Sequence, residues 1–289
     1  MSESFCFGTL AVGPRYRAHA QLLAADIQEY APNKTLVILT DKLDEFKQFS
    51  HVLAYKHHIE SVKGYYDKSF VIENALANFE TCLFLDSDLR ILGPVPEYMD
   101  FAPGLTGRFG CPILKHNKNL RKGPGLPLIE TVGKGFKLDF DKVSWLHECF
   151  FAVRRQEGLE KRFFHYWKLL GYYFQTKGVY SGVGNIMGLA AAIAEFSVEF
   201  KRDDFFPFFK DCIEKFNIKE GKSTWENKAA YFKAHQDIEY PSRGLVGKIT
   251  HKISSQIGCY SRLAQIYWSA SQDEDFKKLK TILRNYESG

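Results

Sequence analysis

The sequence predicts an α/β protein with a mostly parallel central sheet flanked by helices. Two observations carry this prediction. Short, nearly continuous apolar runs alternate along the first part of the chain with segments whose apolar residues recur at helical spacing. Continuous apolar strands are typical of a sheet covered on both faces, and strand–helix–strand units favour parallel pairing through right-handed crossovers.

Four apolar runs are the predicted strands. They are residues 4–10 (SFCFGTL), 35–39 (TLVIL), 51–55 (HVLAY, the weakest of them) and 81–85 (TCLFL). In open α/β sheets, ligands bind at the carboxyl ends of the strands. We therefore expect a ligand site to be built from the residues that follow these runs.

Helices are predicted between and after the strands. Residues 17–30 and 67–79 carry apolar residues at helical spacing, and so do residues 159–173 and 185–196. Residues 94–139 follow no such period and are predicted to be irregular.

Composition and charge limit which ligands and which cellular location we expect for this protein. The net charge of +5 suits an anionic ligand or membrane surface and is too small to indicate nucleic acid as a partner. The six cysteines are scattered without a C-x-x-C pair, so no zinc site is expected. No signal peptide or membrane-spanning run is recognised, so we expect a cytoplasmic protein.

Two aspartates follow the fourth predicted strand, in the stretch TCLFLDSDLRIL. Asp86 and Asp88 repel each other unless a positive group lies between them, and a divalent cation is the economical one. Carboxylate oxygens suit Mg²⁺ or Mn²⁺, which keep open positions for substrate phosphates. The pair therefore predicts a metal–diphosphate site, and the alternative is a pair of turn or capping aspartates.

Three stretches carry a resemblance to a known family: SFCFGTLAVG, DKSFVIENAL and FLDSDLRILGPV. With them, the first part of the chain resembles nucleotide-sugar-dependent glycosyltransferases of the GT-A fold. The layout is most similar to the retaining families related to glycogenin and to bacterial lipopolysaccharide galactosyltransferases. The resemblance implies a catalytic domain over residues 1–240, with a nucleotide-binding half at 1–100 and an acceptor half at 101–240. Residues 241–289 would form a helical extension.

The resemblance also implies roles around the two aspartates. Asp86 and Asp88 would hold Mn²⁺ or Mg²⁺ against the diphosphate of a UDP-sugar, with Ser87 beside the ribose or the metal. Lys68 would contact the sugar or phosphates and stabilise the leaving group, and the alternative for Lys68 is plain surface charge. His235 would be the third metal ligand, although the Gly and Lys-Pro-Trp that often follow this histidine in the relatives are absent.

The resemblance further implies which residues contact the nucleotide and which contact the acceptor. Thr9, Ala11 and Arg17 would lie near the base and ribose, and Asp41 would contact the uracil edge. Glu148, in the stretch SWLHECFF, would bind the acceptor or act as the catalytic base, and the alternative is a salt-bridged carboxylate at a strand edge. A base at Glu148 favours inversion, whereas proton transfer to the diphosphate favours retention.

Two later segments admit two interpretations each. The glycines of residues 181–185 (SGVGN) could admit a sugar to the backbone or allow tight helix packing. Residues 244–268 predict a basic amphipathic helix, which could contact an anionic membrane or pack on the main domain. A membrane contact would suit a glycan or lipid-linked acceptor.

Two other functions compete with sugar transfer. A non-catalytic protein of the same fold could bind a nucleotide or sugar without turnover. A phosphohydrolase of the haloacid-dehalogenase type also places Asp-x-Asp after an apolar strand, but usually near the N-terminus and followed by Gly-Thr, whereas Leu89-Arg90 follows here.

Overall fold

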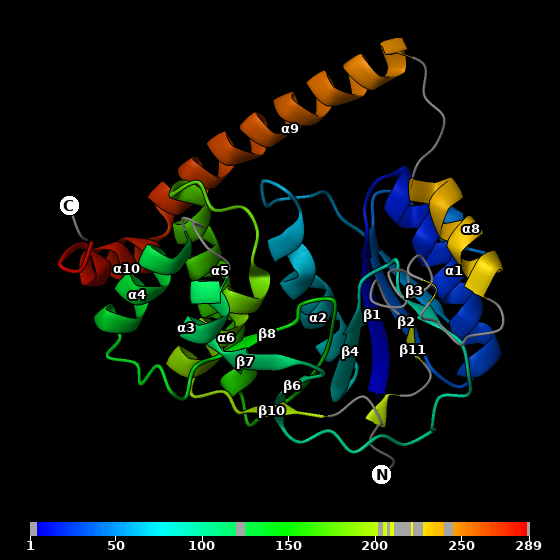
Figure 1. Ribbon diagram of the computed structural model, residues 1–289, viewed down its shortest axis with the longest axis horizontal. Helices are drawn as coiled ribbons and strands as arrows, with labels where there is room; N and C mark the ends of the chain where they lie inside the picture. The colour runs from blue at the N-terminus through cyan, green and yellow to red at the C-terminus, as the bar shows by residue number, and fades with distance from the viewer. Residues whose placement is uncertain are drawn as a thin grey trace.

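The computed structural model describes residues 5–119, 125–201, 205–206, 209–210, 221, 228–239 and 245–287. A seven-stranded sheet in the order β10-β6-β9-β4-β1-β2-β3 forms its centre (Figure 1). The strands are β1 (Phe5–Ala11), β2 (Leu36–Thr40), β3 (Val52–Lys56), β4 (Thr81–Leu85), β6 (Gly104–Gly107), β9 (Phe150–Arg154) and β10 (Val198–Phe200).

The sheet is mostly parallel. β1 pairs in parallel with β2 and β4, β2 with β3, and β6 with β10, whereas β9 runs antiparallel to both β4 and β6. The predicted α/β class and the mostly parallel sheet are confirmed. All four predicted strands are present, each within one or two residues of its expected bounds.

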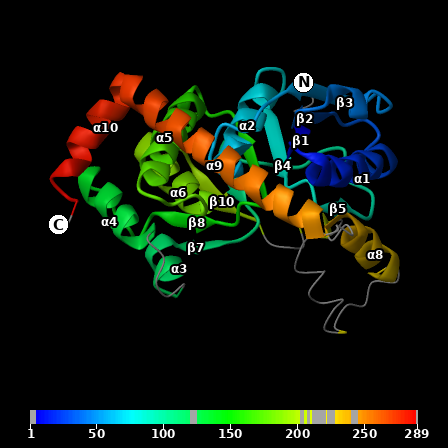
Figure 2. The same ribbon diagram turned by 90° about the horizontal axis from the view of Figure 1, so that it is seen from above.

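Helices cover both faces of this sheet (Figures 1 and 2). The larger ones are α1 (Pro14–Tyr30), α2 (Lys68–Leu76), α4 (Gly125–Gly135), α5 (Leu159–Thr176), α6 (Val183–Ala194), α8 (Lys228–Glu239), α9 (Leu245–Gln272) and α10 (Glu274–Arg284). Two short 3₁₀ turns, η1 (Leu43–Phe46) and η2 (Tyr65–Asp67), complete the N-terminal half.

Alternate residues of each strand enter different apolar clusters. Phe7 and Leu83 pack in one cluster with the buried face of α1, while Cys6 and Cys82 pack in the other with α2, α5 and α6. Successive side chains of a strand point to opposite faces, so the two clusters lie on opposite faces of the sheet. This is why the strands are apolar throughout.

The prediction that residues 94–139 are irregular is wrong. This segment contains β6, the short strand β7 (Gly110–Pro112), α3 (Ile113–Asn119) and α4. β7 pairs with β8 (Ser144–Leu146), and a further short pair joins β5 (Arg90–Ile91) to β11 (Phe209–Lys210). Strands this short and rich in glycine carry no apolar period, because neighbouring strands supply their pairing.

The C-terminal helices α9 and α10 both contact α5, and α9 extends from there across the molecule. α9 crosses above α5 and α2 toward α8 (Figure 2), and its contacts with α5 bury Ile266 and Ala270. Nearer its middle, the guanidinium of Arg262 donates hydrogen bonds to the carbonyl of Val62 at 2.8 and 3.0 Å. Among the described helices, none combines the length and apolar character needed to cross a membrane.

Candidate ligand and metal site at the carboxyl end of the sheet

A cavity of about 420 Å³ lies beyond the ends of β1 and β4. The chain adds β2 and β3 on one side of β1 and then β4 on the other, so a crevice forms beyond the ends of β1 and β4. Leu10 and Val12 line the cavity from the end of β1, and Asp86, Ser87 and Asp88 line it from the end of β4. Its volume falls in the range of small-molecule sites.

Buried Lys68 and partly buried Asp86 form an ion pair in this cavity. Lys68 is the first residue of α2 and is only 4% exposed, so the alternative of plain surface charge is wrong. Its Nζ lies 2.7 Å from Asp86 Oδ1 and donates to the carbonyl of Glu148 at 2.9 Å. Burial opposes the charged form of Lys68, but the nearby Asp86 outweighs it and the pKa of Lys68 is raised. The ammonium therefore stays charged.

The same surroundings also shift the pKa of Asp86. Burial raises the pKa of Asp86, while the charge of Lys68 acts in the opposite direction. The backbone N–H of Asp86 donates to the carbonyl of Cys149 at 2.9 Å, which fixes β4 to β9 at this point. The carboxylate thus depends on Lys68 as its counter-charge.

Asp88 contacts His235 rather than Lys68. Its Oδ2 lies 3.9 Å from Nε2 of His235 on α8. Burial alone would raise the pKa of Asp88, but the neighbouring side chains of His235 and His19 lower it. The two aspartates of the D-S-D stretch therefore have separate partners, Lys68 for Asp86 and His235 for Asp88.

His19, His235 and Glu239 offer ligand atoms that all lie within 4.8 Å of one another. His19 comes from α1, and the other two lie one turn apart on α8, which packs on α1. Nε2 of His19 is 3.0 Å from Glu239 Oε1, and the rings of His19 and His235 are 4.9 Å apart. Two imidazoles and a carboxylate are a chemically suitable set for a transition-metal ion.

The sequence prediction named His235 but missed His19 and Glu239. The spacing of His235 and Glu239, four residues apart in a helix, is a usable signal, because such residues share a face. Nothing in the sequence pairs His19 with them, since that requires the packing of α1 on α8.

The predicted nucleotide contacts of Thr9 and Ala11 are not found. Both side chains are 0% exposed, and Thr9 Oγ1 donates to the carbonyl of Leu85 at 2.7 Å. Neither residue lines the cavity, whereas Leu10 and Val12, at the alternate positions of the same segment, do. We correct both assignments on this ground.

Arg17 and Asp41 contact each other. Arg17 Nη1 lies 2.7 Å from Asp41 Oδ1, and its Nε lies 2.8 Å from Glu45 Oε2. Asp41 also accepts a hydrogen bond from the N–H of Gly13 at 3.0 Å. Neither Arg17 nor Asp41 lines the cavity, so the structure gives this pair a bracing role for the β1–α1 connection.

Cations and aromatic rings that the sequence analysis did not single out line the cavity instead. Arg15 and Tyr16 enter from the start of α1, Tyr65 from η2, and Lys63 and Arg262 from the side covered by α9. Tyr16 and Tyr65 are 41% and 42% exposed, which leaves ring faces accessible to a planar ligand. No motif marks these residues, because they come from three separate elements.

Glu148 lies behind the cavity. Its carbonyl accepts the hydrogen bond from Lys68, and its Oε2 accepts one from the N–H of Gly184 at 3.1 Å, at the start of α6. A carboxylate at a helix N-terminus is stabilised by the free N–H groups and the helix dipole. This contact replaces the salt bridge considered for Glu148 from the sequence.

Tight packing is the observed role of the glycines near residue 184. A Cβ added to Gly184 would overlap the carbonyl oxygen of Leu146, and one added to Gly188 would overlap that of Ser144. Both carbonyls belong to β8, so α6 approaches that strand at a distance that only glycine permits.

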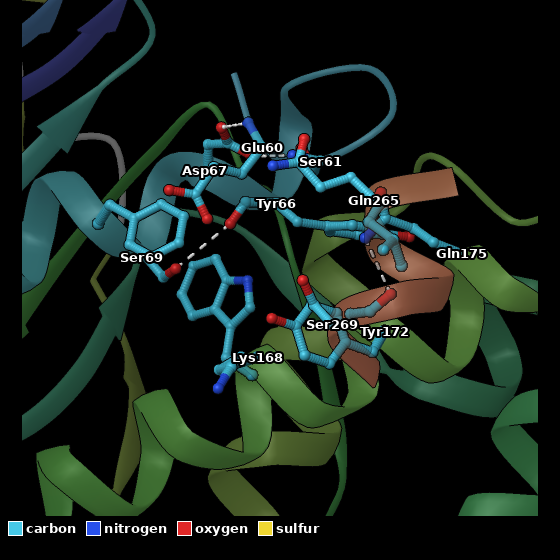
Figure 3. Close-up of a pocket in the computed structure, with 14 residues that line it drawn as sticks. Glu60, Ser61, Tyr66, Asp67, Ser69, Lys168, Tyr172, Gln175, Gln265 and Ser269 are labelled. Atoms are coloured by element: carbon cyan, nitrogen blue, oxygen red, sulfur yellow. Dashed lines mark hydrogen bonds between the residues drawn. The ribbon is translucent and has the colours of Figure 1, made fainter. Parts of the chain in front are cut away.

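A second, smaller cavity of about 80 Å³ lies between η2, α5 and α9 (Figure 3). Asp67 and Ser69 approach it from one side, Lys168 and Tyr172 from α5, and Gln265 from α9. This volume is well below the range that small-molecule ligands require. The 420 Å³ cavity is therefore the better candidate for a nucleotide-sized ligand.

Comparisons with known proteins do not assign this chain to a family. No protein-family model matches it, and a search of the curated proteins finds no significant match. The functional argument therefore depends on the geometry of the cavity.

Proposed function

We propose that this protein is a metal-dependent glycosyltransferase of the GT-A fold that moves a sugar from a nucleotide-sugar, specifically a UDP-sugar, to a hydroxyl acceptor. The observation that carries the proposal is the cavity at the ends of β1 and β4, where Asp88 and the Lys68–Asp86 pair meet. Its position is the one at which open α/β sheets bind nucleotides. The order β3-β2-β1-β4 is also that of the first four strands of a dinucleotide-binding sheet, in which the crevice lies beyond β1 and β4.

The charges of the cavity suit a departing diphosphate. Breaking the bond between sugar and phosphate builds negative charge on the leaving group, which fixed cations stabilise. Lys68 is held rigidly by Asp86 and the Glu148 carbonyl, and Arg15 and Lys63 line the same space. A divalent cation bound beside Asp88 would add charge stabilisation of the same kind.

The aromatic residues suit the nucleoside part of the donor. Tyr16 and Tyr65 line the same cavity as Asp86 and Asp88 and are partly exposed. A base stacked on either ring is bound without the side-chain contacts first expected from Thr9 and Ala11.

Glu148 remains the proposed base or acceptor-binding residue. Its carbonyl accepts the hydrogen bond from Lys68, so its backbone lies next to a cation of the proposed leaving-group site. The contact with Gly184 would hold the Glu148 carboxylate in a fixed position. Both stereochemical outcomes are compatible with this arrangement.

The proposed acceptor is a glycan or a lipid-linked saccharide. α9 passes beside the cavity, to which it contributes Arg262, and carries exposed apolar and aromatic residues along its outer face. We propose that this helix brings the cavity to a membrane surface from the cytoplasmic side, where a lipid-linked acceptor would be presented.

Calorimetric titration of UDP with and without Mn²⁺ tests the donor assignment. Wild-type protein should bind UDP more tightly with Mn²⁺, and Asp88→Asn should lose that gain. UDP-sugars would then be screened for release of UDP in the presence of saccharide acceptors.

The outcomes separate the three functions. A wild-type protein that binds no UDP under either condition would contradict the donor assignment. Binding of a UDP-sugar without transfer or release would favour a non-catalytic binding protein. Hydrolysis of simple phosphomonoesters without nucleotide would favour the phosphohydrolase.

A further inference from the structure

We infer that the metal ion of this cavity is held by Asp88, His19, His235 and Glu239, and that Asp86 stays outside its coordination sphere. The inference deepens the proposed function, since it rests on a metal-assisted site in the same cavity. It replaces the ligand set expected from the D-S-D stretch with one that joins β4, α1 and α8.

Three of the four side chains form a compact group, and Asp88 adjoins it through His235. The ligand atoms of the two histidines and Glu239 lie within 4.8 Å of one another, and Asp88 Oδ2 is 3.9 Å from His235 Nε2. Ligands bound at about 2.1 Å lie at most about 4.2 Å apart on opposite sides of an ion. Small movements of the two histidines and Glu239 would therefore bring them to one ion, which Asp88 would reach by turning its side chain.

Rigid elements hold three of the four ligands. His19 and His235 are 2% and 5% exposed, on helices that pack against each other. Glu239 is braced by Arg15, whose Nη1 lies 3.3 Å from Glu239 Oε2. Asp88 is more exposed, at the edge of the cavity, so it can adjust to the ion.

Asp86 is committed to another cation. Lys68 Nζ lies 2.7 Å from Asp86 Oδ1 and is anchored from behind by the Glu148 carbonyl. A dication placed on Asp86 would sit close to this buried ammonium, and like charges repel strongly at such separations. Asp86 therefore positions Lys68, while Asp88 binds the metal.

The donor set also predicts which metal is bound. Two imidazole nitrogens favour Zn²⁺ or Co²⁺, and Mn²⁺ accepts them more readily than Mg²⁺, which prefers a shell of oxygen ligands and retained waters. A site built from both aspartates alone would accept Mg²⁺ readily. We therefore expect Mn²⁺ to bind in the presence of excess Mg²⁺.

The test is a titration of the full-length protein with Mn²⁺ in the absence of nucleotide, followed by the electron paramagnetic resonance signal of free Mn²⁺. Glu239→Gln and His19→Gln should weaken binding at least by the roughly 10–100-fold that loss of an outer-shell partner costs. Asp86→Asn should change it little. Glu274→Gln on α10, 74% exposed, is the matched control for charge, and thermal unfolding of each variant checks its fold.

Three results would overturn the inference: no Mn²⁺ binding by wild-type protein, unchanged binding in Glu239→Gln and His19→Gln, or a loss in Asp86→Asn as large as that in Asp88→Asn. Because nucleotide is absent, these results are independent of the donor assignment. Protein that binds Mn²⁺ through these residues but fails to bind UDP would support the metal site and contradict the proposed transferase.

Discussion

The ion pair between Lys68 and Asp86 is the residue-level feature on which the cavity depends. Replacing Lys68 by Met leaves a partly buried carboxylate without its counter-charge, and such losses cost about 3–5 kcal/mol where the remaining charge is fully buried. Because the Asp86 side chain is 27% exposed, we expect the free energy of unfolding of Lys68→Met, measured by urea denaturation, to fall by less than this amount.

A double-mutant cycle tests whether the pair itself causes that loss. Lys68→Met combined with Asp86→Leu removes both charges, and the double variant should be more stable than Lys68→Met alone. Equal stability of the single and double variants would show that Lys68 acts through its packing against Phe84, 5.3 Å from Nζ, rather than through Asp86.

The sequence identified part of this site and missed the rest for a physical reason. Asp86, Asp88 and Lys68 were found because each follows or starts a recognisable element. Their division between two partners was not predicted, because it depends on how α2 and α8 approach the end of β4. Periodicity describes one element at a time, whereas a site of this kind is made between elements.

At the scale of elements, the close approach of α6 to β8 rests on glycine. Gly188→Ala would place a methyl group against the carbonyl of Ser144, and overpacking of this kind costs about 1–3 kcal/mol. Gly171→Ala in α5 is the matched control, since its Cβ would have only ordinary contacts, the nearest at 3.9 Å.

Chemical denaturation of both glycine variants distinguishes space from helix propensity. Alanine is a better helix former than glycine by about 1 kcal/mol, so Gly171→Ala should be neutral or stabilising while Gly188→Ala destabilises. Similar changes in both variants would contradict the packing role assigned to Gly188.

The start of α10 gives a prediction that depends on pH. Asp273 accepts hydrogen bonds from the N–H groups of Asp275 and Phe276, and it pairs with Lys168 at 2.9 Å. Burial would raise the pKa of Asp273, but the Lys168 and backbone hydrogen bonds lower it below 3.8. Its stabilising effect is therefore present above the unfolded pKa and is lost as pH falls through the lower folded value.

Asp273→Ala should cost about 1 kcal/mol at neutral pH, and the difference from wild type should shrink below about pH 4. Thermal unfolding from pH 7 to pH 3 measures it. Asp273→Asn keeps a capping side chain and loses only the charge, so it should retain most of the stability. A difference that does not change with pH would indicate that the charge of Asp273 contributes nothing.

At the scale of the whole molecule, the fold class was predictable from the sequence, whereas the order of the strands in the sheet was not. The fold class followed from the apolar strands, because a sheet buried on both faces leaves no polar positions in them. β6 and β9, which extend the sheet beyond β4, are joined by pairings with distant segments. Such pairings leave no local period, so the order of the sheet had to come from the structure.

The outer face of α9 carries a row of exposed apolar and aromatic side chains. Ile253, Ile257, Tyr260, Tyr267 and Trp268 recur at helical spacing and are 51–72% exposed. The helix sequence contains three Lys or Arg residues and no Asp or Glu. Exposed aromatic rings on a positively charged helix suit an anionic membrane interface.

We therefore expect the protein to sediment with vesicles that contain anionic lipid, and to do so less at high salt. Ile257→Ser with Tyr260→Ser should lower the partition coefficient at least about tenfold, since burying one large apolar side chain contributes about 1.5–3 kcal/mol. Ile282→Ser, on the exposed face of α10, is the control and should have little effect. Equal sedimentation of the double variant and wild type would exclude this face from membrane binding, and self-association abolished by the same two substitutions would assign it to a second copy of the chain.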